Sequence, residues 1–364
     1  MSNEDKYFVA LNTNIKIGPA RFKKLLAYFG SAKKAWQGTD RDFRLAGIDR
    51  ETIETILETR QNIDPDEEIA KLGKEKIQIV TIKDKGYSNL LKEIYNPPAL
   101  LYVKGELKAI DEISVAVVGT RKLSFYGRMI TPKIAGNLAR NKITIVSGLA
   151  LGIDTLAHRA ALDAGGRTIA VIAGGIDERS IYPPINRKLA SEIVGRNQGA
   201  IISEQHIGTN SLKQYFPARN RIVAGLALGT LVVEAPERSG ALITAKLALD
   251  ANREVFAVPG SVLSPQSIGP NNLIKMGAKM ATSSQDILDE LNIKEIYSQK
   301  NIQEILPENK LEKLIFKVLT TEPVHIDKII KKVKLDTSVV TSTMTMMEIK
   351  GLIKNLGAGN YARR

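Results

Sequence analysis

The sequence predicts an α/β protein whose central domain is a Rossmann-like, doubly wound and mostly parallel sheet. Six short apolar runs between residues 112 and 292 carry this prediction: ISVAVVG, ITIVSG, TIAVIAGG, GAIISE, GTLVVEA and REVFAVPG. Each run is nearly continuous in apolar residues, as expected of parallel strands that are buried on both faces. The segments between them are compatible with helices, and strands that alternate with helices favour a parallel sheet covered on both sides.

A small helical module is expected before this domain, over residues 1–62. A Gly18-Pro19 turn is followed by apolar residues at helical spacing, namely Phe22, Leu25, Leu26 and Phe29. A second unit of the same kind begins at Gly47-Ile48. Paired hairpins of this kind resemble helix-hairpin-helix or SAM-like units, whose glycine turns can offer N–H groups to a phosphate. A packing module without a DNA contact is the alternative interpretation.

Three further segments complete the predicted organisation. Residues 63–111 contain two β-rich runs, at 77–82 and 99–103, on either side of a helical stretch, and we interpret them as a β/α lead-in to the main domain. The polar stretch 293–309 is expected to be a linker. Residues 310–364 contain three helical stretches and a hairpin with a glycine-rich tip, which predicts a winged-helix domain.

The composition favours a cytoplasmic protein that binds polyanions. Lys and Arg total 52 against 39 Asp and Glu, which gives a net charge of +13, and such a balance favours phosphate-bearing partners through counterion release. A generally basic surface is the alternative explanation. Cysteine is absent, which excludes disulfides and thiolate chemistry. The sequence has neither a signal-peptide pattern nor a run of about 18 apolar residues, so we expect no membrane attachment.

Glycine-rich turns and cations are predicted to meet at one edge of the central sheet, because doubly wound sheets bind ligands outside the carboxyl ends of their strands. Turns that lead into helix N-termini can hold an anion with backbone N–H groups. The residues expected at this edge are Gly119, Thr120, Arg121, Ser147, Gly148, Gly174, Gly175, Lys213, Phe216, Arg219, Asn220, Arg221, Ser239 and Gly240.

Phe216 indicates what kind of anion this could be. It lies three residues after Lys213 and three before Arg219, so that a ring alternates with cations. Proteins bind single-stranded nucleic acid in this way, with bases stacked on rings and phosphates held along the groove. A buried core phenylalanine is the alternative interpretation.

Several other chemistries lack their sequence patterns. There is no G-x-x-x-x-G-K-[ST], no intact G-x-G-x-x-G and no G-x-S-x-G, so we expect neither a nucleotide cofactor nor a nucleophile elbow. The histidines His158, His206 and His325 lack ligand spacing, so no metal is expected. His158 is expected to be an exposed helix residue.

Glu234 and Asp154 are the candidates for acid–base chemistry. Glu234 follows a predicted strand and is either a general base or a carboxylate that pairs with Arg219 or Arg221. Asp154 begins a predicted helix, where a carboxylate stabilises the helix dipole without taking part in chemistry.

Ordered blocks over about residues 95–280 resemble the DNA-processing protein A family (DprA, also called Smf). They are VVGTRKLSFYG, IVSGLALGIDTLAHRAAL, IAGGID with IYPPIN, GAIISE, FPARNRIVAGLALGTLVVEAPERSGALITAKLAL and VFAVPGSVLSPQSIGPNNLIKMGA. Members also carry an N-terminal helical module and a C-terminal winged helix, so the resemblance covers nearly the whole chain.

The resemblance implies a DNA-binding protein of bacterial natural transformation that is not an enzyme. Family members bind and protect single-stranded DNA, help load the RecA recombinase on it, and dimerise through the Rossmann-like domain. By this resemblance, Arg121 and Ser147-Gly148 contact phosphates, Lys213 and Arg219 line the same groove, and Phe216 stacks on a base. The other residues expected at this edge are assigned to DNA binding with them.

Two other functions fit parts of the sequence. A nucleotide-processing hydrolase, similar to the cytokinin-activating phosphoribohydrolases, would use Glu234 as its base. A transcription regulator would read duplex DNA through the winged helix. The third helix of that domain, however, offers mainly Thr, Ser and Met where Arg, Asn or Gln would be expected to read bases.

Overall fold

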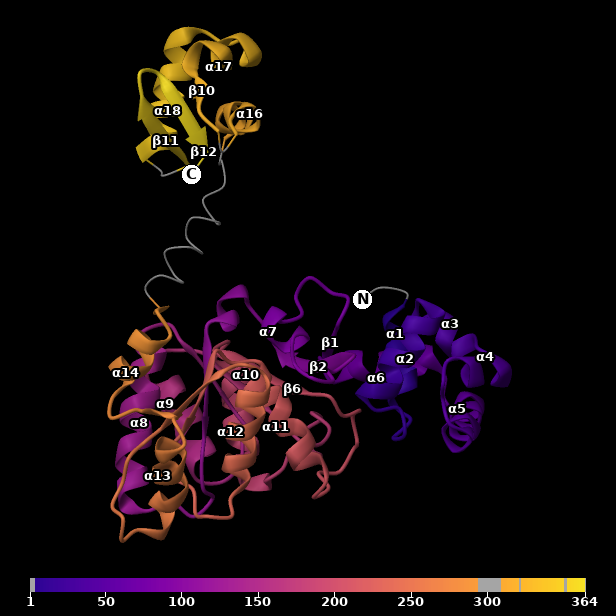
Figure 1. The fold of residues 1–364 in the computed structure, drawn as a ribbon. Coiled ribbons are helices and arrows are strands. Elements are labelled where there is room, and N and C mark those ends of the chain that lie inside the picture. Colours follow the sequence, from indigo (N-terminus) through magenta and orange to yellow (C-terminus); the bar gives the residue numbers. More distant parts are fainter. Residues whose placement is uncertain (1–3, 294–308, 321, 350–351, 364) are drawn as a thin grey trace. The chain divides into compact units, whose positions relative to one another are not determined.

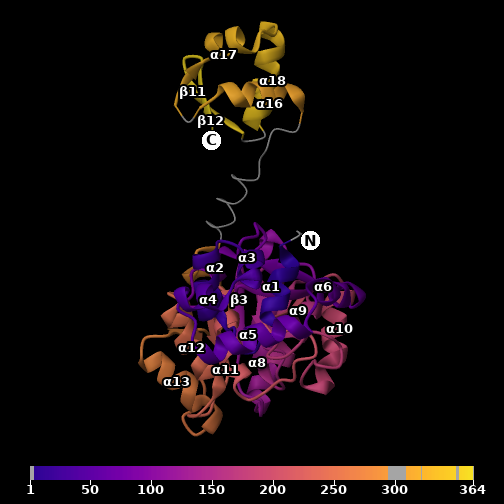
Figure 2. The same ribbon diagram turned by 90° about the vertical axis from the view of Figure 1, so that its right-hand side faces the viewer.

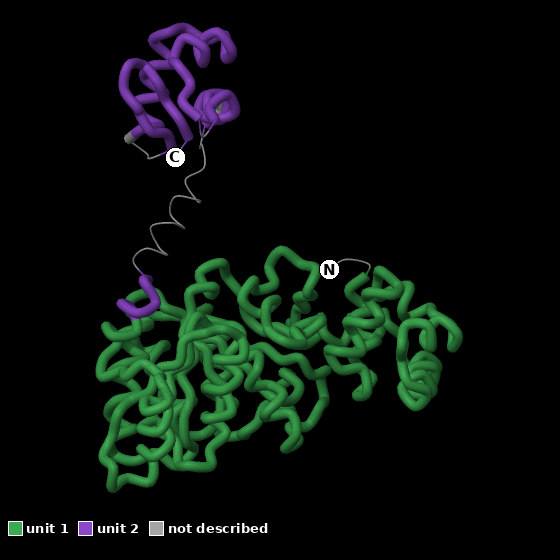
Figure 3. Tube along the Cα trace, viewed as in Figure 1, with its two compact units in different colours: residues 1–287 green, residues 288–364 purple. Residues whose placement is uncertain are grey.

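The computed structural model describes residues 4–293, 309–320, 322–349 and 352–363 (Figure 1). The chain divides into two compact units, Met1–Ile287 and Leu288–Arg364 (Figure 3). The predicted linker, 293–309, lies outside the described residues except for its two end positions.

A nine-stranded sheet forms the centre of the first unit, in the order β1-β2-β6-β5-β4-β3-β7-β8-β9. The six predicted strands are present and run parallel to one another, which confirms the predicted fold class. Their bounds are β3 (Ser114–Val118), β4 (Thr144–Ser147), β5 (Thr168–Val171), β6 (Gly199–Ser203), β7 (Gly229–Val232) and β8 (Glu254–Ala257), and β9 (Lys279–Met280) follows β8.

Two antiparallel strands extend this sheet, and both come from the segment interpreted as a lead-in. β2 (Leu100–Gly105) pairs with β6, and β1 (Gln78–Thr81) pairs with β2. Helix α7 (Asn89–Lys92) lies between them in the chain. Residues 78–105 are therefore part of the main sheet, because β2 completes the hydrogen bonding of the edge that β6 would otherwise leave open.

Helices cover both faces of the sheet, which explains why its strands are continuously apolar. Alternate residues of a strand point to opposite faces. Ile169 and Val171 of β5 pack with α11 (Tyr215–Gly225) and α12 (Gly240–Asp250). Ala170 between them packs with α9 (Ile153–Asp163) and α10 (Arg187–Gly195). The helices α8 (Phe125–Arg140), α13 (Ile268–Lys275) and α14 (Ser284–Glu290) complete the set.

The N-terminal helical module packs directly on the sheet and shares its core, as Figure 2 shows from the module's side. Phe8, Phe22 and Trp36 of the module belong to one buried cluster with Tyr102 of β2. The helices are α1 (Asp5–Asn12), α2 (Pro19–Phe29), α3 (Ala32–Gln37), α4 (Asp40–Leu45), α5 (Arg50–Asn62) and α6 (Pro65–Lys74). Helix α6 packs against α1, so the module extends beyond residue 62.

The second unit is the predicted winged helix. Its helices are α16 (Lys310–Val318), α17 (Ile326–Val333) and α18 (Thr337–Ile349), and its strands are β10 (Val324–His325), β11 (Ile353–Gly357) and β12 (Asn360–Arg363). The strands form a small sheet in the order β10-β12-β11. Ile315, Ile329, Val340 and Met344 fill its core. In the part of the chain that the structure describes, no helix has the length and apolarity that a membrane span requires.

Candidate nucleic-acid interface

The strand order creates a crevice between β3 and β7. From β3 the chain builds outward through β4, β5 and β6, and then returns to place β7 on the other side of β3. The loops after these two neighbouring strands therefore diverge, and ligands of doubly wound sheets bind at such a reversal. A pocket of about 300 Å³ lies here.

This pocket brings together most of the residues predicted from the sequence. The predicted residues that line it are Gly119, Thr120, Arg121, Gly148, Phe216, Arg219, Asn220, Ser239 and Gly240. Arg238, Thr244 and Asp154 join them. Sequence reasoning missed Arg238, although its place directly before Ser239, which caps α12, is a signal that could have identified it.

The turn after β4 is held by Asp154. Its carboxylate accepts the Gly148 N–H at 3.0 Å and the Ala150 N–H at 3.4 Å. Burial raises the pKa of Asp154, and the nearby Arg219 guanidinium opposes this shift. Asp154 thus stabilises the turn itself, more specifically than the helix-dipole role expected for it. The hydroxyl of Ser147 is buried and donates to the Val117 carbonyl at 2.6 Å, which joins β4 to β3.

Arg219 places a buried positive charge beside this turn. Its side chain is 7 % exposed, and its guanidinium donates to the carbonyl oxygens of Gly148 and Val171. Burial lowers the pKa of Arg219 to about 10, against the opposing effect of Asp154, so the group stays charged at neutral pH. A Cβ on Gly148 would lie 2.6 Å from the Arg219 Nη atoms. The glycine is therefore required for this close approach.

Arg121 and Phe216 form the exposed part of the site. The Arg121 guanidinium carbon lies 5.3 Å from the centre of the Phe216 ring, a cation–π arrangement. The Tyr182 ring meets Phe216 edge-on, with 6.1 Å between centroids. Phe216 is only partly buried and lines the pocket, whereas its neighbour Tyr215 is the buried aromatic of this segment. The core interpretation of Phe216 was therefore wrong.

Glu234 holds the loop that carries Arg121. Its carboxylate accepts the N–H of Ser124 at 3.0 Å and the Ser124 hydroxyl, while its own carbonyl accepts the Thr120 N–H at 2.7 Å. The side chain is 1 % exposed. The expected pairing of Glu234 with Arg219 or Arg221 was wrong, because both of its carboxylate oxygens accept hydrogen bonds from Ser124.

The remaining predicted residues lie outside the lining of the pocket. The Gly175 N–H donates to the Thr209 carbonyl at 2.9 Å, and a Cβ on Gly174 would meet that same carbonyl, so the loop after β6 packs on these glycines. Arg221 is bound to Glu204 at 2.7 Å. Lys213 is exposed on the segment that leads into α11.

His158 is fully buried, so its expected exposure was wrong. Its Nδ1 lies 2.6 Å from the Thr168 hydroxyl, and that hydroxyl donates to the Ile145 carbonyl at 2.8 Å. His158 therefore donates through Nδ1. Burial, together with the positive charge of Arg219, lowers the pKa of His158 to about 3. The helical pattern did not reveal this, because α9 packs against both the sheet and α8.

Comparison with known proteins identifies the family. Residues 78–292 match the family model described as DNA recombination-mediator protein A, and residues 303–359 match the DprA winged helix domain. The chain belongs to the DprA/Smf family. Protein Smf of Synechocystis is 34% identical, with all of both chains covered. DprA of Streptococcus pneumoniae is 48% identical over 223 residues, which are 61% of this chain and 77% of that relative.

Two solved DprA structures are similar to this chain. The X-ray structure of DprA from Streptococcus pneumoniae has a TM-score of 0.67 and 39% identity, and the match covers 80% of this chain and 98% of that one. A structure that describes the single-stranded DNA binding mode of Helicobacter pylori DprA has a TM-score of 0.53 and 32% identity. That match covers 60% of this chain and 97% of the other.

Proposed function

We propose that this DprA/Smf protein binds single-stranded DNA at the pocket between β3 and β7. The observation that carries the proposal is the pair formed by exposed Arg121 and half-buried Phe216, beside the buried charge of Arg219. A ring flanked by cations offers a base a stacking surface and offers the adjoining phosphate a positive partner. The binding mode described for the Helicobacter pylori relative supports the same choice of ligand.

The electrostatics of the pocket favour a polyanion. Arg121, Arg219 and Arg238 line it, and the acid among its lining residues is Asp154, which is buried and bound to the turn. Arg121 and Arg238 are exposed and can reach a phosphate, whereas Arg219 acts through its charge and through the position of Gly148. Phosphate contacts of this kind make binding salt-dependent and insensitive to base sequence.

We extend the proposal to the wider role that the family resemblance implies. The protein would protect the strand and load RecA on it during natural transformation or recombination, as a cytoplasmic homodimer joined through the Rossmann-like domain and without enzymatic activity. The family's description as a recombination mediator supports this role. The hydrolase alternative assigned the base to Glu234, whose carboxylate is bound by Ser124. The regulator alternative would have to read bases with the exposed Thr341, Ser342 and Thr345 of α18.

Removal of the Arg121 charge tests the site. Fluorescent oligo-dT and a matched duplex are titrated across a salt series with the native protein, Arg121→Ala and Arg140→Ala. Arg140 is an exposed cation at the C-terminal end of α8, whereas Arg121 lies in the loop before that helix. Each substitution removes one positive charge, so the two variants have the same net charge. We expect Arg121→Ala to weaken oligo-dT binding by about tenfold or more and to reduce the slope of log K against log salt by about 0.7.

The comparison among these titrations decides the proposal. Binding of oligo-dT that is much tighter than duplex binding, and normal in Arg140→Ala, would support a specific site at Arg121. Equal losses in the two variants would show a diffuse charge effect and overturn the assignment of the site. Weak binding to both nucleic acids by the native protein would overturn the function.

A further inference from the structure

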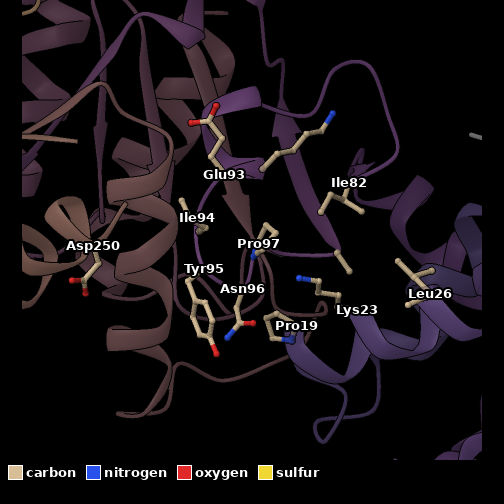
Figure 4. Close-up of a pocket in the computed structure, with 13 residues that line it drawn as sticks. Pro19, Lys23, Leu26, Ile82, Glu93, Ile94, Tyr95, Asn96, Pro97 and Asp250 are labelled. Atoms are coloured by element: carbon tan, nitrogen blue, oxygen red, sulfur yellow. The ribbon is translucent and has the colours of Figure 1, made fainter. Parts of the chain in front are cut away.

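A second and larger pocket lies where the helical module meets the sheet domain. Its volume is about 840 Å³, within the range of ligand-binding clefts. Helix α2 forms one side with Pro19, Lys23 and Leu26, and the turn after α7 forms the other with Tyr95, Asn96 and Pro97 (Figure 4). Asp250, the last residue of α12, closes one margin. Both sides belong to the same compact unit.

The side chains of this pocket suit an aromatic anion. Its walls are mainly apolar, and the Tyr95 side chain stands at the mouth with 86 % of its surface exposed. Figure 4 shows the Lys23 amino group pointing into the space between Pro19 and Pro97. Lys23 forms no ion pair with any residue that the structure describes. An exposed aromatic ring and an unpaired cation that line the same pocket can together bind a nucleobase and its phosphate.

The acids of the pocket do not cancel this charge. Glu93 is bound by Arg253 at 2.8 Å, and its carboxylate points away from the centre of the pocket in Figure 4. Lys92 adds a second exposed cation to the lining. Asp250 is the remaining acid, at the margin.

Helix α12 connects this pocket to the DNA site. Its first residue, Gly240, lines the pocket between β3 and β7, and its last residue, Asp250, lines the pocket at the module. Eleven residues at about 1.5 Å each separate the two ends by roughly 16 Å. Ile243 and Lys246 are exposed along the helix between them. For comparison, a single-strand-binding OB fold contacts about 4–16 nucleotides, which is more than a pocket of about 300 Å³ can hold.

We propose that the pocket between the helical module and the sheet is a second contact for single-stranded DNA. A strand held at Arg121 and Phe216 continues along α12 to the second pocket. There one base stacks against Tyr95, and a phosphate lies near Lys23. The helical module then lengthens the DNA-binding track and does more than stabilise the fold. This inference rests on the proposed function, since α12 carries the strand from the first site to the second.

Strand length separates the two sites experimentally. Affinities for a series from dT3 to dT20 are measured by competition against a labelled strand, with the native protein, Tyr95→Ala, Tyr95→Phe and Lys23→Ala. Lys33→Ala is the matched control, because Lys33 is exposed on α3 of the same module and outside the pocket. Both substituted side chains are exposed, so unchanged thermal melting is expected and verifies the fold.

The expected result depends on strand length. All forms should bind dT3 equally, because it occupies the first site alone. For dT20, Tyr95→Ala should lose about 5- to 100-fold in affinity at an unchanged salt slope, and Tyr95→Phe should restore binding. Lys23→Ala should lower the salt slope by about 0.7, with Lys33→Ala normal. Asp250→Asn should bind dT20 more tightly, because it removes the acid at the margin.

Other results overturn the inference. The second contact would be rejected if Tyr95→Ala and Lys23→Ala bound dT20 with native affinity while Arg121→Ala bound it more weakly. That result would leave the proposed function standing. Equal losses in Lys23→Ala and Lys33→Ala would show general electrostatics. Tyr95-dependent binding of free dTMP, with dT20 unaffected, would identify a mononucleotide as the occupant. Failure of the native protein to bind any strand would instead reject the proposed function.

Discussion

At the scale of single residues, the site depends on one close approach between a glycine and a buried arginine. Arg219 reaches the Gly148 and Val171 carbonyls from α11, and it does so across the space that a side chain at Gly148 would occupy. The buried charge of Arg219 is compensated by these carbonyl oxygens and by Asp154. A change at Gly148 therefore acts on the charge as well as on packing.

Gly148→Ala is predicted to destabilise the fold by about 1–3 kcal/mol, because its Cβ overlaps the Arg219 guanidinium and forces that group to move. Displacement of Arg219 should also weaken oligo-dT binding. Urea unfolding and the oligo-dT titration measure the two effects. Gly73→Ala is the matched control, since nothing lies within 4 Å of a Cβ there, and it should leave stability unchanged or slightly raise it. Equal stability of Gly148→Ala and the native protein would contradict the prediction.

At the scale of elements, the loops after β3 and β7 form one unit. The carbonyl of Glu234 binds Thr120 and its carboxylate binds Ser124, so the loop from β7 fixes both ends of the loop that carries Arg121. Gly127 at the start of α8 leaves room for this carboxylate, which a Cβ would overlap. The position of Arg121 over Phe216 is thus set by contacts made from the neighbouring strand.

Glu234→Gln is predicted to lower the free energy of unfolding by about 1–3 kcal/mol, because an amide nitrogen replaces one of the two acceptors that Ser124 uses. The loosened loop should also reduce oligo-dT affinity and its dependence on salt. Chemical denaturation and the salt series provide the measurements. Glu237→Gln, an exposed acid in the same loop, should behave as the native protein. A stable Glu234→Gln protein with normal affinity would refute the positioning role.

At the scale of the whole molecule, the buried and neutral His158 makes the first unit sensitive to acid. Burial lowers the pKa of His158 to about 3 from its usual 6.5, and burial also lowers the pKa of His206, although Glu68 partly opposes that shift. Between pH 6.5 and about pH 3, the unfolded chain binds a proton at His158, whereas His158 in the folded protein stays neutral. Stability is therefore full above pH 6.5 and declines as the pH falls toward 3.

A decrease from pH 7 to pH 5 is predicted to cost about 2 kcal/mol through His158 alone, at 1.36 kcal/mol per pH unit below its unfolded pKa. Urea unfolding of the first unit at the two pH values, compared between the native protein and His158→Gln, measures this contribution. The variant should be less stable at pH 7 yet lose less on acidification. His325→Gln, at an exposed position of the winged helix, should retain the native pH dependence. Parallel pH profiles for the native protein and His158→Gln would disprove the linkage.

The sequence by itself determined the architecture and the edge at which the site lies. Runs such as GTLVVEA are apolar throughout because helices cover both faces of the sheet, and this local pattern is sufficient to predict parallel strands. The carboxyl end of each predicted strand then indicates the edge of the sheet at which a ligand binds. Arg121, Phe216, Arg219 and Gly148 could be assigned to one site because the carboxyl ends of parallel strands lie together.

Only the tertiary structure decided which side chains at that edge remain available. Arg221 is paired with Glu204, the loop after β6 packs on Gly174 and Gly175, and Glu234 binds Ser124, 110 positions away. The helical module likewise meets the turn at Tyr95 only in the folded chain. Periodicity and turn chemistry are local, whereas these contacts depend on the distances between packed loops, and packing is what selects the partner of each charge.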